Sequence, residues 1–242
     1  IGAVVNVRES TIARESDAVF PILAGPEIGV ASTKAFTCQL AVLASLAIGA
    51  GVARGTVRAK EEEDMVRHLV EMPRIMARVL NIIQPQMESL AREISKFKDV
   101  LYLGRGTSFP LAMEGALKLK EISYIHAEGY AAGELKHGPI ALIDENMPVI
   151  VIAPFDRFFD KTVSNMQEVA ARGGRIIFIT DDAGAAASTL PTMATIILPV
   201  VDEIIAPIIF SLPIQLLAYH TAVFMGTDVD QPRNLAKSVT VE

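Results

Sequence analysis

The stretch Val100-Leu101-Tyr102-Leu103 is a short apolar run that leads directly into Gly104-Arg105-Gly106-Thr107-Ser108. Beyond this turn, from Leu111 to Ile122, apolar residues recur at helical spacing. An apolar run, a glycine-containing turn and a helix make one strand, turn and helix unit. Because the run is apolar throughout, both faces of the strand are expected to be buried, as they are in a parallel sheet.

The same pattern recurs towards the carboxyl terminus. The runs Val149–Ala153, Arg175–Thr180 and Thr195–Val200 predict three further strands, and Lys161–Arg172 predicts a helix between the first two. Strands that alternate with helices favour a parallel sheet with helices on both faces. The residues therefore predict the α/β fold class.

Residues 60–97 have a different pattern, in which apolar residues recur at spacings of three and four. Pro73 and Pro85 lie in the same stretch, and proline disfavours a helix interior. We therefore expect two or three helices here, joining two lobes.

Composition narrows the class of protein. The chain has 242 residues, of which 51% are hydrophobic, so it can fill a substantial core. A net charge of −6 gives no diffuse basic field, and we predict no nucleic-acid partner. The single cysteine, Cys38, cannot form an internal disulfide, which fits a reducing cytoplasm. No two of the four histidines have metal-ligand spacing, so we predict no metal and no cofactor.

Two uncharged stretches, residues 35–53 and 204–226, approach the length that crosses a bilayer. The second contains Gln215 and His220, which are costly in lipid and ordinary in a buried helix. The sequence from Ile1 onward has no pattern of a targeting signal. We therefore predict neither a membrane span nor secretion.

A pair of short motifs occurs twice. Glu27-Ile28 is followed twelve positions later by Gln39-Leu40, and Glu203-Ile204 is followed twelve positions later by Gln215-Leu216. Each copy follows an apolar run and opens a long uncharged helix, which indicates an internal duplication. Because only 26 residues precede the first copy, the first domain is expected to be incomplete.

Three regions could carry chemistry. The loop Gly104–Ser108 lies where parallel α/β folds bind ligands, although a tight packing turn explains its glycines equally well. Lys118 and Glu121 share one helix face, as either a surface ion pair or a sheltered proton carrier beside a lysine. The polar segment 227–242 is either a frayed terminus or a lid whose lysine can offer its amine to a carbonyl.

Three stretches together, Glu27–Phe36, Glu114–Pro139 and Asp228–Glu242, resemble the isomerase domain of the glutamine-dependent fructose-6-phosphate amidotransferase family. The resemblance extends over essentially the whole chain. It implies a flavodoxin-like, three-layer parallel sheet, the SIS domain, as one complete copy and the carboxyl-terminal part of a first copy. It also implies a homodimer that binds a sugar phosphate.

The resemblance implies three segments. Residues 1–57 would be the carboxyl-terminal part of the first SIS domain, and residues 58–226 would be linker helices and the second SIS domain. Residues 227–242 would be a tail that closes over the active site.

The resemblance also assigns roles to single residues. Glu121 would move a proton between C1 and C2 of the sugar. His137 would reach into the neighbouring subunit's site and help to open the sugar ring. Lys237 would form a Schiff base with the open-chain ketone or serve the same site. Four residues would contact the sugar phosphate: Val30, Ser32, Lys118 and Ala236.

The implied activity is the conversion of fructose 6-phosphate and ammonia to glucosamine 6-phosphate. The family's phosphate-binding Ser-Gln-Ser-Gly-Glu-Thr motif does not occur in these residues, so this fragment is expected to be inactive alone. An alternative is a non-catalytic SIS module that binds sugar phosphates for regulation. Lys237 and its neighbours in the tail favour the enzyme, because a sensor has little need of them.

Overall fold

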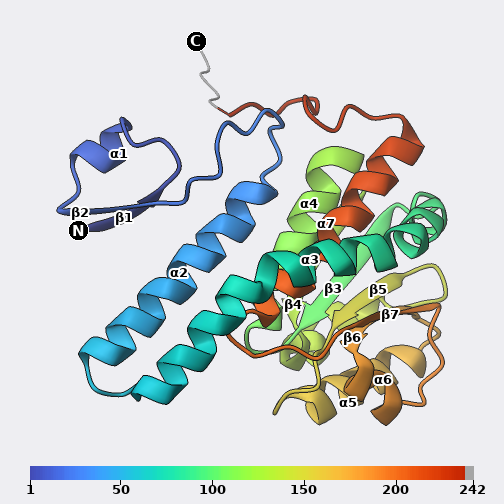
Figure 1. Cartoon of the computed structure of the whole chain (residues 1–242). Helices are drawn as coiled ribbons and strands as arrows, with labels where there is room; N and C mark the ends of the chain where they lie inside the picture. Colours follow the sequence, from blue (N-terminus) through green and yellow to red (C-terminus); the bar gives the residue numbers. More distant parts are fainter. Residues whose placement is uncertain (238–242) are drawn as a thin grey trace.

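The larger sheet has five parallel strands in the order β4-β3-β5-β6-β7 and lies between two layers of helices (Figure 1). We describe it from a computed structural model of the chain, for residues 1–237. The strands of this sheet are β3 (Asp99–Gly104), β4 (His126–Ala131), β5 (Pro148–Ile152), β6 (Arg175–Asp181) and β7 (Ala194–Leu198). The predicted parallel α/β fold is confirmed.

The central strand β3 explains why its sequence is apolar throughout. It pairs with β4 on one side and β5 on the other, so that Leu101 lies opposite both Glu128 and Val149. Tyr102 packs into the core on one face of the sheet, and Leu103 packs into the core on the other. Both faces are covered, and both sets of side chains are buried.

Strand β4 was not predicted from the sequence. It forms one edge of the sheet, where Ala127 is buried but His126 is exposed. Such an edge strand has no continuous apolar run, and its polar residues resemble those of a loop.

Helices of different length cover the two faces of the sheet. In Figure 1, α3, α4 and α7 lie on one face, and α5 and α6 lie on the other. Two short 3-10 helices, η1 and η2, follow β4. The bounds of these elements are α3 (Ala59–Ile94), α4 (Ser108–Ser123), α5 (Phe159–Ala170), α6 (Asp182–Ala187), α7 (Ala206–Met225), η1 (Ala132–His137) and η2 (Pro139–Leu142).

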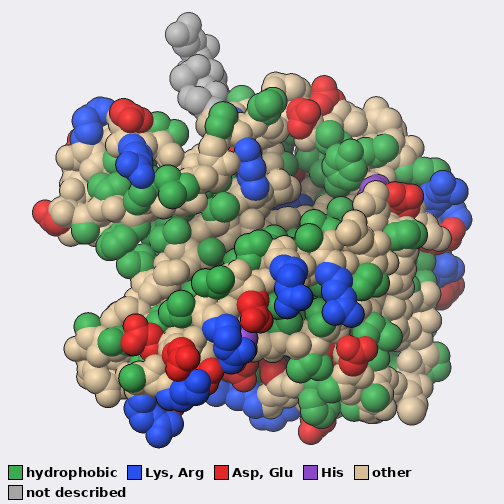
Figure 2. Space-filling model, in the orientation of Figure 1, with side chains coloured by type: hydrophobic (Ala, Val, Ile, Leu, Met, Phe, Trp, Pro, Cys, Tyr) green, Lys and Arg blue, Asp and Glu red, His purple; other side chains and the backbone are tan. Residues whose placement is uncertain are grey.

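A smaller unit precedes these elements. Strands β1 (Gly2–Val5) and β2 (Ala18–Pro21) form a two-stranded parallel sheet, and the short helix α1 (Thr11–Arg14) lies between them in the sequence. Helix α2 (Lys34–Ala53) then runs beside α3, to which a short turn connects it (Figure 1). Few charged side chains gather on the visible surface over α2 (Figure 2).

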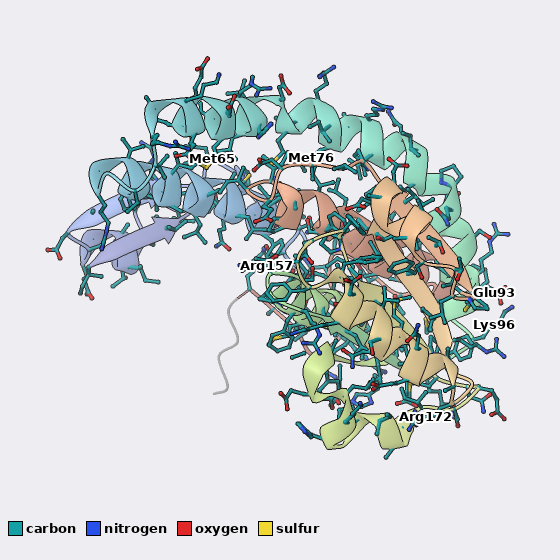
Figure 3. The ribbon with its side chains drawn as sticks, turned by 90° about the horizontal axis from the view of Figure 1, so that it is seen from below. Met65, Met76, Glu93, Lys96, Arg157 and Arg172 are labelled. Atoms are coloured by element: carbon teal, nitrogen blue, oxygen red, sulfur yellow. The ribbon has the colours of Figure 1, made fainter. Side chains whose placement is uncertain are left out.

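The segment between the two sheets differs from the prediction. The expectation of two or three helices is wrong, because α3 is one helix of 36 residues with Pro73 and Pro85 inside it. Figure 3 shows this helix curving over the molecule, with Met65 and Met76 on the side that faces α2 and α7. Buried residues such as Met87 pack against the core along the helix, which offsets the hydrogen bonds that the prolines remove.

Candidate functional site

A cavity of about 350 Å³ lies where four segments far apart in the sequence meet. They are the loop of residues 26–34, the second half of α4, the middle of α7 and the segment after α7. The lining residues are Pro26, Glu27, Ile28, Gly29, Ala31, Thr33, Lys34, Lys118, Ile122, Gln215, Ala218, Tyr219, Val229 and Asp230.

The loop of residues 26–34 is organised by the carboxylate of Glu27. Its Oε1 accepts hydrogen bonds from the backbone N–H groups of Thr33, at 3.0 Å, and Ala35, at 3.4 Å. These donors belong to the start of α2, where the helix leaves N–H groups without helical partners. Burial acts to raise the pKa of Glu27, but these hydrogen bonds and the nearby Lys237 outweigh it and lower the pKa below its usual value.

Lys118 is a buried residue in the lining of the cavity. It is only 3% exposed, and its Nζ lies 2.5 Å from Glu121 Oε2 and 3.7 Å from Glu114 Oε1. All three side chains project from one face of α4. The interpretation of Lys118 and Glu121 as a surface ion pair is therefore wrong, because the pair is sheltered.

The second carboxylate near Lys118 is affected by the same burial. Burial raises the pKa of Glu114, while the positive charge of Lys118 opposes the shift. The buried ammonium of Lys118 thus lies between two carboxylates of the same helix face, at 2.5 Å from Glu121 and 3.7 Å from Glu114.

The segment after α7 is bound to the rest of the molecule over much of its length. The Val30 N–H donates to the Asp230 carbonyl at 2.9 Å, and Thr227 Oγ1 donates to the Ile122 carbonyl at 2.6 Å. The Arg233 N–H donates to Tyr124 Oη at 2.9 Å. The interpretation of a tail that frays directly after α7 is therefore wrong for this part, which passes over the end of α4 (Figure 1).

The predicted residues at the end of this segment lie near the cavity mouth. Lys237 Nζ is 3.4 Å from Glu27 Oε2, and Ala236 beside it is exposed. Val30 and Ser32 belong to the loop that lines the cavity, although their own side chains are not part of the lining. The predicted tail also includes residues 238–242, which lie outside the described residues.

His137 lies apart from this group. It ends η1, after the carboxyl end of β4, whereas α4 runs back and carries Glu121 towards the amino ends of the strands. The His137 side chain is 72% exposed, and its Nδ1 lies 2.7 Å from Glu134 Oε2. Within one chain, the structure does not bring His137 to the cavity.

The glycine loop of residues 104–108 also lies at the carboxyl edge of the sheet. It is a tight turn, because a Cβ on Gly104 would lie 2.1 Å from the Ser108 carbonyl oxygen. Gly106 has a φ of +54° and leaves no room for a Cβ beside the Phe158 ring. Packing accounts for both glycines, although Gly106 also lines a second cavity of about 340 Å³.

Among the lining residues, Lys118 is the one that was predicted as a site residue, and those that were missed include Glu27, Gln215, Tyr219 and Asp230. The repeated motif was a signal for two of these, Glu27 and Gln215. Glu27 belongs to the first copy of the repeated motif and Gln215 to the second, and the two copies meet at this cavity. Gln215 Nε2 lies 3.5 Å from the Thr33 carbonyl oxygen.

Among residues 1–237, no group of three or more His, Cys, Asp or Glu side chains is placed to hold a metal ion. The expectation of no metal and no cofactor remains a prediction. The cavity itself offers the amine of the buried Lys118 and the carboxylates of Glu27 and Asp230. Glu114 and Glu121 lie behind it as partners of Lys118, and Lys237 pairs with Glu27.

Named relatives match the chain along its whole length. It is 85% identical over 242 residues to a glutamine--fructose-6-phosphate aminotransferase [isomerizing] of Agrobacterium fabrum. It is 86% identical to a protein of the same name from Rhizobium meliloti. The chain spans 40% of the length of these relatives.

Solved structures share the fold. The C-terminal domain of glucosamine-fructose-6-phosphate aminotransferase from Francisella tularensis matches with a TM-score of 0.92 and 42% identity, over 96% of this chain and 64% of that one. A glucosamine-6-phosphate deaminase from Thermotoga maritima matches with a TM-score of 0.71 and 21% identity, over 99% of this chain and 66% of that one. This second likeness shows the fold alone.

A model of the SIS domain family matches residues 2–49 and 93–225, which together make up most of the chain. The first match includes β1, β2 and most of α2, and the second includes the five-stranded sheet with α4 to α7. This chain belongs to the SIS domain family.

Proposed function

We propose that this chain is the isomerase part of a glutamine--fructose-6-phosphate aminotransferase and acts in making glucosamine 6-phosphate from fructose 6-phosphate and ammonia. One observation carries the proposal: the cavity is lined by Lys118, which pairs with the sheltered Glu121, and by Glu27, to which the carboxyl-terminal segment brings a second lysine, Lys237. The names of the relatives agree with this activity.

Glu121 is the proton carrier in this proposal. Isomerisation removes a proton from C1 and returns one to C2, so a single base near both carbons suffices. Glu121 accepts the C1 proton as a carboxylate and then donates it to C2. The ammonium of Lys118, 2.5 Å away, offsets negative charge that develops between these two transfers.

Lys237 provides the amine in this proposal. Its neutral form adds to the C2 carbonyl of the open-chain sugar, a C–N bond forms, and the carbonyl oxygen leaves as water to give an imine. Ammonia then adds to C2 and displaces the lysine amine, which returns Lys237 to its starting state. Val30, Ser32 and Ala236 lie in the segments that flank the cavity mouth, where they would contact the sugar.

We also propose that the active molecule is a homodimer in the cytoplasm, in which His137 of each chain serves the partner's cavity in ring opening. The His137 side chain is exposed, and it lies after the carboxyl end of β4, whereas Glu121 lies towards the amino ends of the strands. Both observations agree with a role of His137 in the site of the partner chain. The further proposals are that residues 1–57 belong to a first SIS domain, and that residues 58–226 hold the second with its linker. Without a phosphate-binding loop, these 242 residues alone would be inactive.

A chimaera tests the activity. This chain would replace the matching region of the Agrobacterium fabrum relative, and formation of glucosamine 6-phosphate from fructose 6-phosphate and glutamine would be measured. Glu121→Gln should lower kcat at least ~100-fold, as loss of a general base does. Lys120→Gln, an exposed neighbour on the same helix, is the matched control.

The outcomes separate enzyme from sensor. Normal turnover by the Glu121→Gln chimaera would remove Glu121 from its proposed role. Binding of fructose 6-phosphate without turnover by the unmodified chimaera would instead favour the regulatory module.

A further inference from the structure

We propose that Glu27 is a positioning residue for Lys237, which fixes the amine at the cavity mouth through a carboxylate anchored on the start of α2. The inference rests on the proposed function, because it concerns the lysine that acts there. It adds a residue to which the sequence assigned no role.

The first step of the argument is the rigidity of Glu27. Its side chain is only 12% exposed, and its Oε1 accepts two backbone N–H groups, from Thr33 and Ala35. A carboxylate held by two main-chain donors has little rotational freedom. The anchor therefore has a fixed place relative to the cavity wall.

The second step is that one oxygen is left for Lys237. Glu27 Oε2 lies 3.4 Å from Lys237 Nζ, and within residues 1–237 it is the one side chain that forms a hydrogen bond or ion pair with this amine. A lysine side chain has many rotamers, and fixing its end lowers the entropy that reaction would otherwise cost.

The third step is that the carboxylate is ionised when it is needed. The lowered pKa of Glu27 keeps it negative at neutral pH. The same charge is complementary both to the resting ammonium form of Lys237 and to the protonated imine, because each carries one positive charge on the same nitrogen. Glu27 can thus hold Lys237 before and after it bonds to the sugar.

The repeat supplies a matched control. Glu203 is the counterpart of Glu27 in the second copy, but it is exposed and does not line this cavity. Glu203→Gln removes the same charge from the equivalent position without touching Lys237.

The experiment uses the full-length chimaera described above. Fructose 6-phosphate is added with borohydride, and the Lys237 adduct is quantified by mass spectrometry of its peptide, together with kcat and KM. Glu27→Gln should slow adduct formation and lower kcat tenfold or more while KM changes less than twofold. Glu27→Asp should recover part of the rate, and Glu203→Gln should match the unmodified protein.

A double-substitution cycle separates positioning from general structure. In a Lys237→Met background, Glu27→Gln should lower the residual kcat less than twofold. An equal loss with and without Lys237, or a normal adduct rate in Glu27→Gln, would overturn the inference. If the unmodified chimaera forms neither adduct nor product, the proposed function itself fails, and the inference fails with it.

Discussion

Helices α2 and α7 are alike in sequence and different in their surroundings. Each has 20 residues, and each is long and apolar enough to cross a bilayer. Yet within the most apolar 18-residue stretch of each helix, 11% of the residues are buried in α2 and 61% are buried in α7. Composition therefore does not decide which apolar helix forms the core. A helix becomes part of the core when other elements pack around it, and α7 is buried because it packs against α3 and α4.

The two copies of the repeated motif differ in the same way. In the second copy, α7 begins at Ala206, shortly after Glu203. In the first copy, α2 begins only at Lys34, and the residues after Glu27 stay in a loop. The later start leaves backbone N–H groups for the Glu27 carboxylate and opens space for the cavity. The duplicated sequence thus yields a core helix in one place and a site in the other.

The largest expected effect is on the core helix. Phe210→Ala in α7 removes a side chain that is 2% exposed and should lower the free energy of unfolding by about 3–5 kcal/mol. Leu43→Ala in α2 removes one that is 51% exposed and should change it by no more than about 0.5 kcal/mol. Urea unfolding measures both. Equal losses would mean that α2 is covered in solution.

A smaller effect is expected where α4 meets α7. A Cβ on Gly115 would lie 2.6 Å from the Tyr102 ring and 3.2 Å from Ile214 Cβ. Gly115→Val should therefore lower the free energy of unfolding by about 1–3 kcal/mol through overpacking. Gly49→Val in α2 is the matched control, because no atom lies within 4 Å of a Cβ there. A tolerated Gly115→Val would indicate looser packing at α7.

The hydrogen bonds from the start of α2 to the Glu27 carboxylate should contribute about 1 kcal/mol to the free energy of unfolding, and this contribution should depend on pH. The pKa of Glu27 is lowered in the folded state, so its contribution is complete above the unfolded value of 4.5 and is lost as the pH falls through the lower folded value. Glu27→Gln should thus cost more stability at pH 7 than at pH 3, which lies below the unfolded value. Urea midpoints at both values, with Glu203→Gln as control, check this. A cost that is independent of pH would argue against the charge.

The smallest expected effect is a gain. Gly49→Ala lies in the exposed part of α2 and should raise the free energy of unfolding by about 0.5–1 kcal/mol, because alanine favours helix more than glycine does. A rise in the thermal midpoint would report it. No gain would imply that α2 is not helical at this point in solution.

The sequence was sufficient to predict those strands and helices whose hydrophobic pattern lies within a short stretch of residues. The run Val100–Leu103 and the helix after it appear as β3 and α4, because a strand buried on both faces must be apolar throughout. Edge strand β4 was missed, and α3 was divided at Pro73 and Pro85, because packing against distant elements decided both cases.

The site could be predicted only in part. The spacing of Lys118 and Glu121 places them on one face of a helix, but their shelter depends on α7 and on the segment after it. Glu27 was missed because its partners are two backbone N–H groups and a lysine 210 residues away. Propensity and periodicity describe neighbours in sequence, so neither gives such contacts.

The separation between Glu27 and Lys237 also has a consequence for the order of folding. Contacts between residues so far apart close a very long loop, and that entropy must be offset by structure already formed. The five-stranded sheet and its helices provide this structure from residues 59–225. The cavity is therefore expected to assemble last, when the loop of residues 26–34 and the segment after α7 meet over a domain that has already folded.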